Sequence, residues 1–403
     1  MRYIILIALV FFAFAEVNAQ DLASYIQEAE KNNPEIQAFE LRYNIAEEKV
    51  NEVNSLPNTE FNFGVMAIAP EMDMPMEQFS ASVMQMLPWF GTISARENYA
   101  SSIAEAQYVD IAIAKRKLSL SVSQSYYKLY AIRAKQLILD ENIELLQTYE
   151  RLALTSLEVG KASAVDVLRL QIRQNELVQQ KEVLEQGFQA EQTLFNNLLN
   201  REENMSVDVV EEMMIPDVDP LVLNENLQIN PELIKYDKLY ESVEQSELLN
   251  QKESGPMVGF GVQYINQKNS PMITSSFKDM VMPMLSISIP IFNNKYKSVT
   301  RQNELKQLEI KFQKEDRLNK LETLLAQGLY NRNATRIKFN VQTDNLKQAI
   351  DAEEILMKNY ETGTIDFNDV LDVQELQLKF QINLIDSIKE YFTEYALINY
   401  LTR

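Results

Sequence analysis

Cysteine and histidine are both absent from this chain of 403 residues. Without cysteine, the chain has no disulfide, no nucleophilic thiol and no thiolate ligand for a metal. Without histidine, it lacks the usual acid–base group for catalysis near neutral pH, and zinc sites built from nitrogen and sulfur ligands are disfavoured. We therefore expect a protein that is not an enzyme and that carries no cofactor.

Basic residues are too few to balance the acidic ones, so the net charge is −20 at pH 7. Such a surface repels phosphates, and we expect no nucleic-acid partner. After residue 20 there is no run of 18 apolar residues, which argues against a transmembrane helix. The apolar run at residues 4–14 follows Arg2 and precedes Val17-Asn18-Ala19. This pattern predicts a secretory signal peptide over residues 1–19.

Proline is missing from residues 89–215 and 291–403, which are rich in the good helix formers Ala, Leu, Glu, Gln, Lys and Arg. Apolar residues recur there at helical spacing. The pattern predicts two long helical hairpins, at about 94–200 and 296–400, whose outgoing helices end near residues 157 and 360. Each outgoing helix would be roughly 95 Å long, which requires coiled-coil-like or tubular packing against neighbours.

A different pattern, with apolar residues at every second position, precedes each predicted hairpin. These residues include Phe61, Phe63 and Val65 in the first half and Val258, Phe260 and Val262 in the second. We predict one strand pair at about 59–88 and another at about 256–291. Strands of about ten residues are long enough to cross a membrane as β-structure. A soluble sheet with one buried face is the alternative.

Three landmarks occur twice in the same order, which indicates a tandem duplication. Asn33-Pro34-Glu35 recurs as Asn230-Pro231-Glu232, Leu87-Pro88-Trp89-Phe90-Gly91 recurs as Ile289-Pro290-Ile291-Phe292-Asn293, and the segment at Gly160 recurs at Gly363. The offsets are 197, 202 and 203 residues. We therefore divide the chain into a first repeat at 20–200, a connector at 201–229 and a second repeat at 230–403.

These paired landmarks resemble the TolC family of outer-membrane efflux ducts over residues 22–400. The resemblance implies a mostly α fold with a membrane β-barrel. Long helical hairpins would form a periplasmic tunnel, and four strands from each protomer would give a 12-stranded barrel in a homotrimer within the lipid of the outer membrane. It also implies passive conduction of substrate delivered by an inner-membrane pump and a periplasmic adaptor.

The alternative is a periplasmic adaptor or structural coiled-coil protein of an export system. Adaptors also carry helical hairpins, but usually one, flanked by compact β domains. Two hairpins and two strand pairs in the same order favour the duct.

The resemblance also implies a gate where the hairpins turn. Asp369 and Asp372 match positions where such ducts place acidic rings, and Asp166 and Tyr360 match positions that link neighbouring coils in the closed state. Ile365 stands where TolC has an arginine, so we expect closure to depend more on apolar contacts. The expected adaptor-contacting tips are Gly160, Lys161, Ser163, Gly363 and Thr364.

Methionine is concentrated in the two strand regions, which hold 11 of the 16 methionines. The densest run contains Met72, Met74 and Met76. Thioethers are soft ligands that suit Cu(I) and, by the same argument, Ag(I). One hypothesis is therefore a copper or silver export duct with a metal site at these three residues. The alternative is that methionine serves as adaptable apolar filling.

Overall fold

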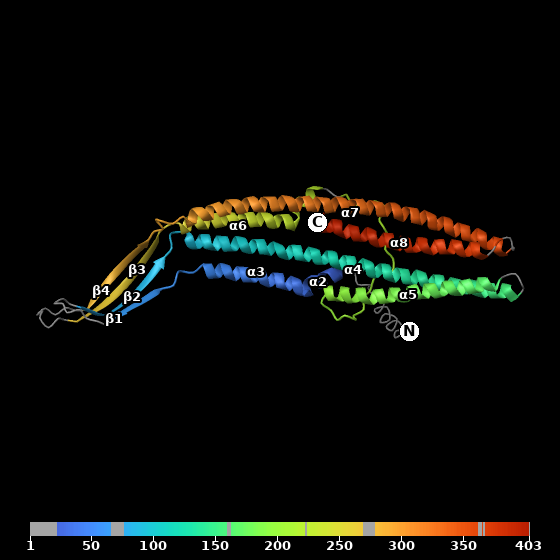
Figure 1. The fold of residues 1–403 in the computed structure, drawn as a ribbon, viewed down its shortest axis with the longest axis horizontal. Helices are drawn as coiled ribbons and strands as arrows, with labels where there is room; N and C mark the ends of the chain where they lie inside the picture. Colours follow the sequence, from blue (N-terminus) through green and yellow to red (C-terminus); the bar gives the residue numbers. More distant parts are fainter. Residues whose placement is uncertain are drawn as a thin grey trace, which may run out of the picture. The chain divides into compact units, whose positions relative to one another are not determined.

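The computed structural model describes residues 22–65, 76–158, 163–221, 224–268, 279–361, 365 and 367–402. Helices make up most of this part of the chain, and four antiparallel strands form one sheet (Figure 1). In chain order the elements are α2 (Leu22–Asn32), α3 (Pro34–Val53), β1 (Glu60–Val65), β2 (Met76–Leu87), α4 (Thr92–Glu158), α5 (Ala164–Leu198), η1 (Asn224–Ile229), α6 (Pro231–Glu253), β3 (Met257–Lys268), β4 (Met280–Ser288), α7 (Lys295–Glu361) and α8 (Phe367–Thr402). The predicted mostly helical fold with four strands in each chain is confirmed.

The two long outgoing helices are α4 and α7, each of 67 residues. Their ends lie within two residues of the predicted ones. Residues buried along α4 include Leu118, Val122, Tyr126 and Leu129, which are three or four positions apart and therefore share one face. No helix in the described part of the chain has an apolar stretch of the length and hydropathy that a bilayer crossing needs.

The sheet has the order β1-β2-β3-β4, so its central pair joins the two sequence repeats. Val83 on β2 faces Val262 on β3, and this register brings the in-phase apolar residues of all four strands onto one face. The prediction extended the last strand to about residue 291, but β4 ends at Ser288. Pro290 explains the earlier end, because proline has no amide hydrogen to donate to a neighbouring strand.

The chain forms two compact units that do not coincide with the sequence repeats. One unit consists of residues 39–111 and 231–317 and contains the sheet. The other consists of the residues before 39 together with 112–230 and those from 318 onward, and it contains α5 and α8. Each unit therefore takes segments from both repeats, so neither repeat folds as a separate body.

The connector that follows α5 is mostly exposed but is held by tyrosine hydroxyls. These accept hydrogen bonds of 3.1–3.2 Å from backbone amides: Tyr25 from Asp208, Tyr126 from Val210 and Tyr130 from Met213. Further along, the carboxylate of Asp219 accepts hydrogen bonds from Arg336 and Tyr391. Backbone groups of an extended segment without strand partners are thus satisfied by side chains of the helices.

The repeated Asn-Pro-Glu motif has a similar structural role in both repeats. The buried Asn33 accepts a hydrogen bond of 2.9 Å from the amide of Glu35, which caps α3, and donates one of 2.9 Å to the carbonyl of Leu198 at the end of α5. In the second repeat the buried Asn230 precedes α6 and donates a bond of 3.0 Å to the carbonyl of Leu401 near the end of α8. The proline that follows suits the first helical position, where no amide donor is needed.

We predict that Asn33→Ala and Asn230→Ala will each lower the free energy of unfolding by about 1–3 kcal/mol, because a buried carbonyl loses its donor. Thermal unfolding followed by circular dichroism measures the loss. Asn58→Ala is the control, because Asn58 is exposed. Unfolding temperatures of the two motif variants that equal that of the control would contradict the assigned role.

Candidate gate at the turns of the helical hairpins

In the first hairpin, the returning helix α5 begins with a capped N-terminus. Ser163 is the N-cap residue of α5, and its hydroxyl accepts a hydrogen bond of 3.2 Å from the amide of Val165. The carboxylate of Asp166 accepts one of 3.0 Å from the amide of Ser163 and completes a capping box. Asp166 is therefore already engaged within its own helix start, where a carboxylate also suits the positive end of the helix dipole.

In the second hairpin, the returning helix α8 begins at a buried aromatic contact. Phe367, the first residue of α8, is 2% exposed. Its ring lies 5.6 Å from that of Tyr149 on α4, edge to face, and 4.9 Å from that of Tyr360 on α7. Such arrangements add about 0.5–1.5 kcal/mol to the burial of the rings. Tyr360 and Ile365, both predicted gate residues, pack half-buried against this cluster, which also contains Val167 and Leu170 of α5.

A carboxylate links the two hairpins beside this cluster. Glu353 on α7 accepts hydrogen bonds from the Tyr149 hydroxyl at 2.6 Å and from the Gln377 amide of α8 at 2.7 Å. Gln377 also donates to the carbonyl of Ala349 at 3.0 Å. Burial, and then the hydrogen bond to Glu353, raise the pKa of Tyr149 above its ordinary value. The hydroxyl therefore stays protonated and remains a donor at physiological pH.

Asp369 and Asp372 lie one turn apart on α8, and both are exposed. Among the described residues neither forms an ion pair. Two arginines of α5 reach the residues on either side of them: Arg169 donates to Asn368, and Arg173 lies 3.3 Å from Glu375. In the described part of the chain, both arginines thus contact neighbours of the two aspartates and neither pairs with the aspartates themselves.

Several predicted site residues lie outside the described residues. They are Gly160, Lys161, Gly363, Thr364, Met72 and Met74, and the side chain of Met76 is not described either. Of the predicted adaptor-contacting tips the structure describes Ser163, which is exposed. In the described part of the chain, no three His, Cys, Asp or Glu side chains are arranged to hold a metal ion.

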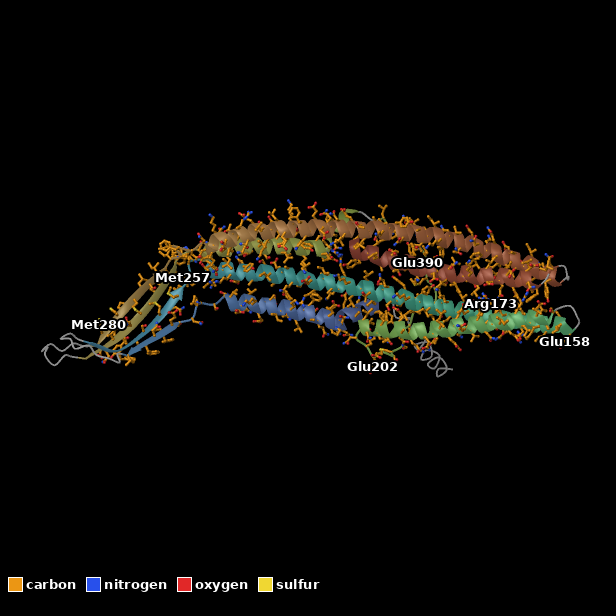
Figure 2. All side chains as sticks on the ribbon, in the orientation of Figure 1. Glu158, Arg173, Glu202, Met257, Met280 and Glu390 are labelled. Atoms are coloured by element: carbon orange, nitrogen blue, oxygen red, sulfur yellow. The ribbon has the colours of Figure 1, made fainter. Side chains whose placement is uncertain are left out.

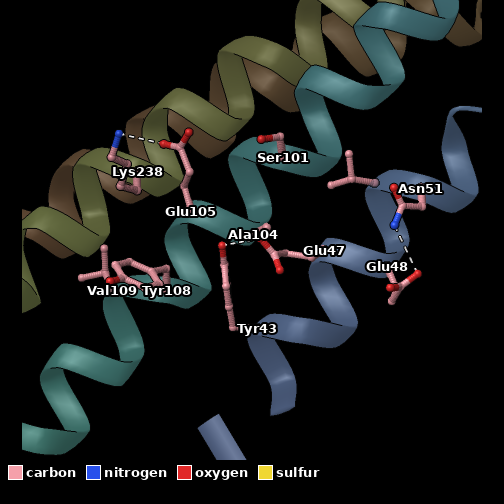
Figure 3. A pocket seen from close by; sticks show the side chains of 11 residues that line it. Tyr43, Glu47, Glu48, Asn51, Ser101, Ala104, Glu105, Tyr108, Val109 and Lys238 are labelled. Atoms are coloured by element: carbon pink, nitrogen blue, oxygen red, sulfur yellow. Dashed lines mark hydrogen bonds and ion pairs between the residues drawn. The ribbon is translucent and has the colours of Figure 1, made fainter. Parts of the chain in front are cut away.

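A surface hollow in the unit that contains the sheet also collects polar groups (Figure 3). The Tyr43 hydroxyl donates to Glu47 at 2.6 Å, which raises the pKa of Tyr43, and Lys238 lies 2.9 Å from Glu105. The ring of Tyr108 lies 5.3 Å from that of Tyr43. Both carboxylates are already paired, so we assign no catalytic site to this hollow.

Sequence reasoning missed the side chains that join the hairpins. Arg169 and Arg173 were detectable in part, because two arginines four positions apart share a face of the returning helix. The pair of Tyr149 and Glu353 was not detectable, because these residues come from different repeats and carry no periodic signal.

Together these elements define a class of protein: a chain with two long helical hairpins and a four-stranded antiparallel sheet, shared with outer-membrane channels. The outer membrane protein VceC of Vibrio cholerae has a similar fold, with a TM-score of 0.75 and 16% identity over 94% of this chain and 96% of that one. CusC gives a TM-score of 0.77 with 14% identity, over 96% and 92% of the two chains. The MtrE outer membrane channel of Neisseria gonorrhoeae gives 0.73 with 13% identity, over 95% and 89%.

The sequence of the first repeat is similar to a known family. Residues 25–198 match the family described as outer membrane efflux protein. No curated protein matches the chain by sequence. The predicted resemblance to TolC-family outer-membrane efflux proteins is thus confirmed, and the family is not one of enzymes.

We predict that Phe367→Ala will destabilise the start of α8 by about 3–5 kcal/mol, because it opens a cavity beneath Tyr149 and Tyr360. Hydrogen–deuterium exchange of amides 367–378 should become faster. Leu376→Ala on the same helix is the control, because that side chain is 44% exposed. Exchange in the Phe367 variant as slow as in the control would contradict the role of the aromatic contact.

Proposed function

We propose that this protein is the outer-membrane exit duct of a tripartite efflux system and that it acts as a homotrimer. Substrate would pass through it passively after delivery by an inner-membrane pump and a periplasmic adaptor. The family match of the first repeat supports the efflux class, and the sheet carries the argument for the assembly.

Among the described residues, one face of the sheet carries exposed apolar side chains. Phe63 is 71% exposed, Leu285 66% and Ile287 59%, and all three lie on the same face. Groups of this size on one sheet face are expensive to leave in water and suit contact with lipid. The opposite face carries polar residues such as Asn62, Ser82 and Gln263, which suits a water-filled interior.

The two edges of the sheet support three copies. Within the described residues, β1 pairs with β2 alone and β4 with β3 alone, so each has a row of unpaired backbone groups. In hydrocarbon every such group must find a partner, and a sheet can achieve this only by closing. Three four-stranded sheets joined β4 to β1 would close in this way and leave no edge.

In a trimer, the turns of the helical hairpins from three chains would meet and form the gate. Three copies of Asp369 and Asp372 would form two acidic rings around a narrow entrance, and such rings favour cations. Asp166, Tyr360 and Ile365 would lie beside neighbouring coils and contribute to closure, mainly through apolar contact at Ile365.

The adaptor would contact the ends of the hairpins. We assign this contact to the predicted tips Gly160, Lys161, Ser163, Gly363 and Thr364. The exposure of Ser163 supports the assignment.

The test of the duct is where the protein resides and how it assembles. We expect the expressed protein to fractionate with the outer membrane and to migrate on gels as a trimer that becomes a monomer only on heating. Recovery as a soluble periplasmic protein would contradict the duct and favour the adaptor alternative.

We predict that Asp369→Asn with Asp372→Asn will lower the preference for cations over anions in planar bilayers, because the rings lose their charge. Reversal potentials in a salt gradient measure this preference. The matched control is Asp344→Asn with Asp351→Asn, which removes the same charge from two exposed positions on α7. An equal change in both double variants would rule out a specific ring at the entrance.

A further inference from the structure

Methionines of the sheet gather on its polar face. The pairing register assigns six of them to the face opposite Phe63 and Leu285: Met84, Met86, Met257, Met280, Met282 and Met284. Met257 and Met280 are labelled near opposite ends of the sheet in Figure 2. The neighbours on this face include Ser82, Gln263 and Ser286. Apolar filling would be expected on the other face, among the phenylalanines and branched residues.

Two glycines of β3 make room for the sulfur atoms of Met84 and Met86. Met84, Gly261 and Met284 lie on one row across three strands, because Gly261 pairs with both methionines. A Cβ atom added to Gly259 would collide with the sulfur of Met86 and would lie 3.2 Å from that of Met84. A Cβ atom added to Gly261 would lie 3.1 Å from the Met84 sulfur. The thioethers of β2 thus occupy the space that the glycines leave open.

The chemistry of this cluster suits a soft cation. Thioether sulfur prefers Cu(I) and Ag(I) to hard cations, and the chain has no cysteine or histidine that would compete for such an ion. Glu60 pairs with Met84 and continues the same row, so it adds a negative charge on the same face. A monovalent soft cation would therefore find both sulfur ligands and a favourable field.

We propose that Met84 and Met86, whose sulfur atoms pack over Gly259 and Gly261, form a thioether site for Cu(I) or Ag(I) together with Met284 of the same row. The site differs from the predicted one at Met72, Met74 and Met76, of which the first two precede β2 in the sequence and the third is its first residue. In the proposed duct this face of the sheet would line the interior, and the bound ion would be cargo in transit. This part of the inference rests on the proposed function. Binding of the ion depends only on the sheet.

Silver titration of the purified full-length protein in detergent tests the site. Calorimetry measures affinity and stoichiometry, and X-ray absorption at the silver edge identifies sulfur ligands. We expect the triple variant Met84→Leu, Met86→Leu, Met284→Leu to bind silver roughly 10- to 100-fold more weakly, the range of loss seen even for outer-shell changes at metal sites. Leucine side chains would still fill the space above the two glycines. A loss of silver binding would therefore be due to the loss of the sulfur atoms.

Two control variants make the result specific. Met205→Leu, Met213→Leu, Met214→Leu removes three sulfurs from the connector, and Met72→Leu, Met74→Leu removes two from the predicted loop site. Both should bind silver as the unmodified protein does. Unchanged binding in the sheet variant, or loss of binding only in the loop variant, would overturn the proposal.

Conductance measured without silver separates this proposal from the duct itself. Normal single-channel conductance with no silver binding would reject the site and leave the duct standing. Silver binding through sulfur, with no conductance and no outer-membrane trimer, would reject the duct and leave the site standing.

Discussion

The ends of the two returning helices, α5 and α8, share one kind of contact, an asparagine side chain that donates to a carbonyl of the last turn. Every α-helix ends with carbonyl groups that have no partner within the helix. Asn33 supplies a donor to Leu198, and Asn230 supplies one to Leu401. Both asparagines are buried, so water cannot readily replace either donor. The Asn-Pro-Glu motif therefore recurs because the backbone requires it, and it need not carry any chemical activity.

The alternation of the strands determines what the sheet can face. A period of two fixes two sets of side chains on each strand, and the pairing of β2 with β3 decides which sets combine. A register shifted by one residue would mix the methionines with Phe260 and Leu285 and give neither a lipid face nor a polar one. The observed register separates the two sets over all four strands. This separation is the property that a sheet between lipid and a water-filled interior needs.

Much of this fold could be predicted because its signals are local. The proline-free stretches located α4 and α7 to within two residues, and alternation located the strands, although Pro290 ended β4 early. Side-chain pairs between the two repeats could not be predicted from the sequence. Tyr149 and Glu353 are 204 residues apart, and nothing in either segment indicates the other. The convergence of Met84 and Met86 over Gly259 likewise required the strand register, which a single strand does not contain.

The relative strength of the contacts between the hairpins bears on how the proposed gate resists opening. Two polar links join α5 to α8: an exposed hydrogen bond from Arg169 to Asn368 and an ion pair between half-buried Arg173 and exposed Glu375. Ion pairs at a protein surface contribute about 0–1 kcal/mol. Full burial of a phenylalanine contributes about 1.5–3 kcal/mol. Phe367 is almost fully buried between Tyr149 and Tyr360, with Ile365 packed beside it. Apolar packing around Phe367 therefore contributes more to holding the start of α8 in place than the polar links to α5 do.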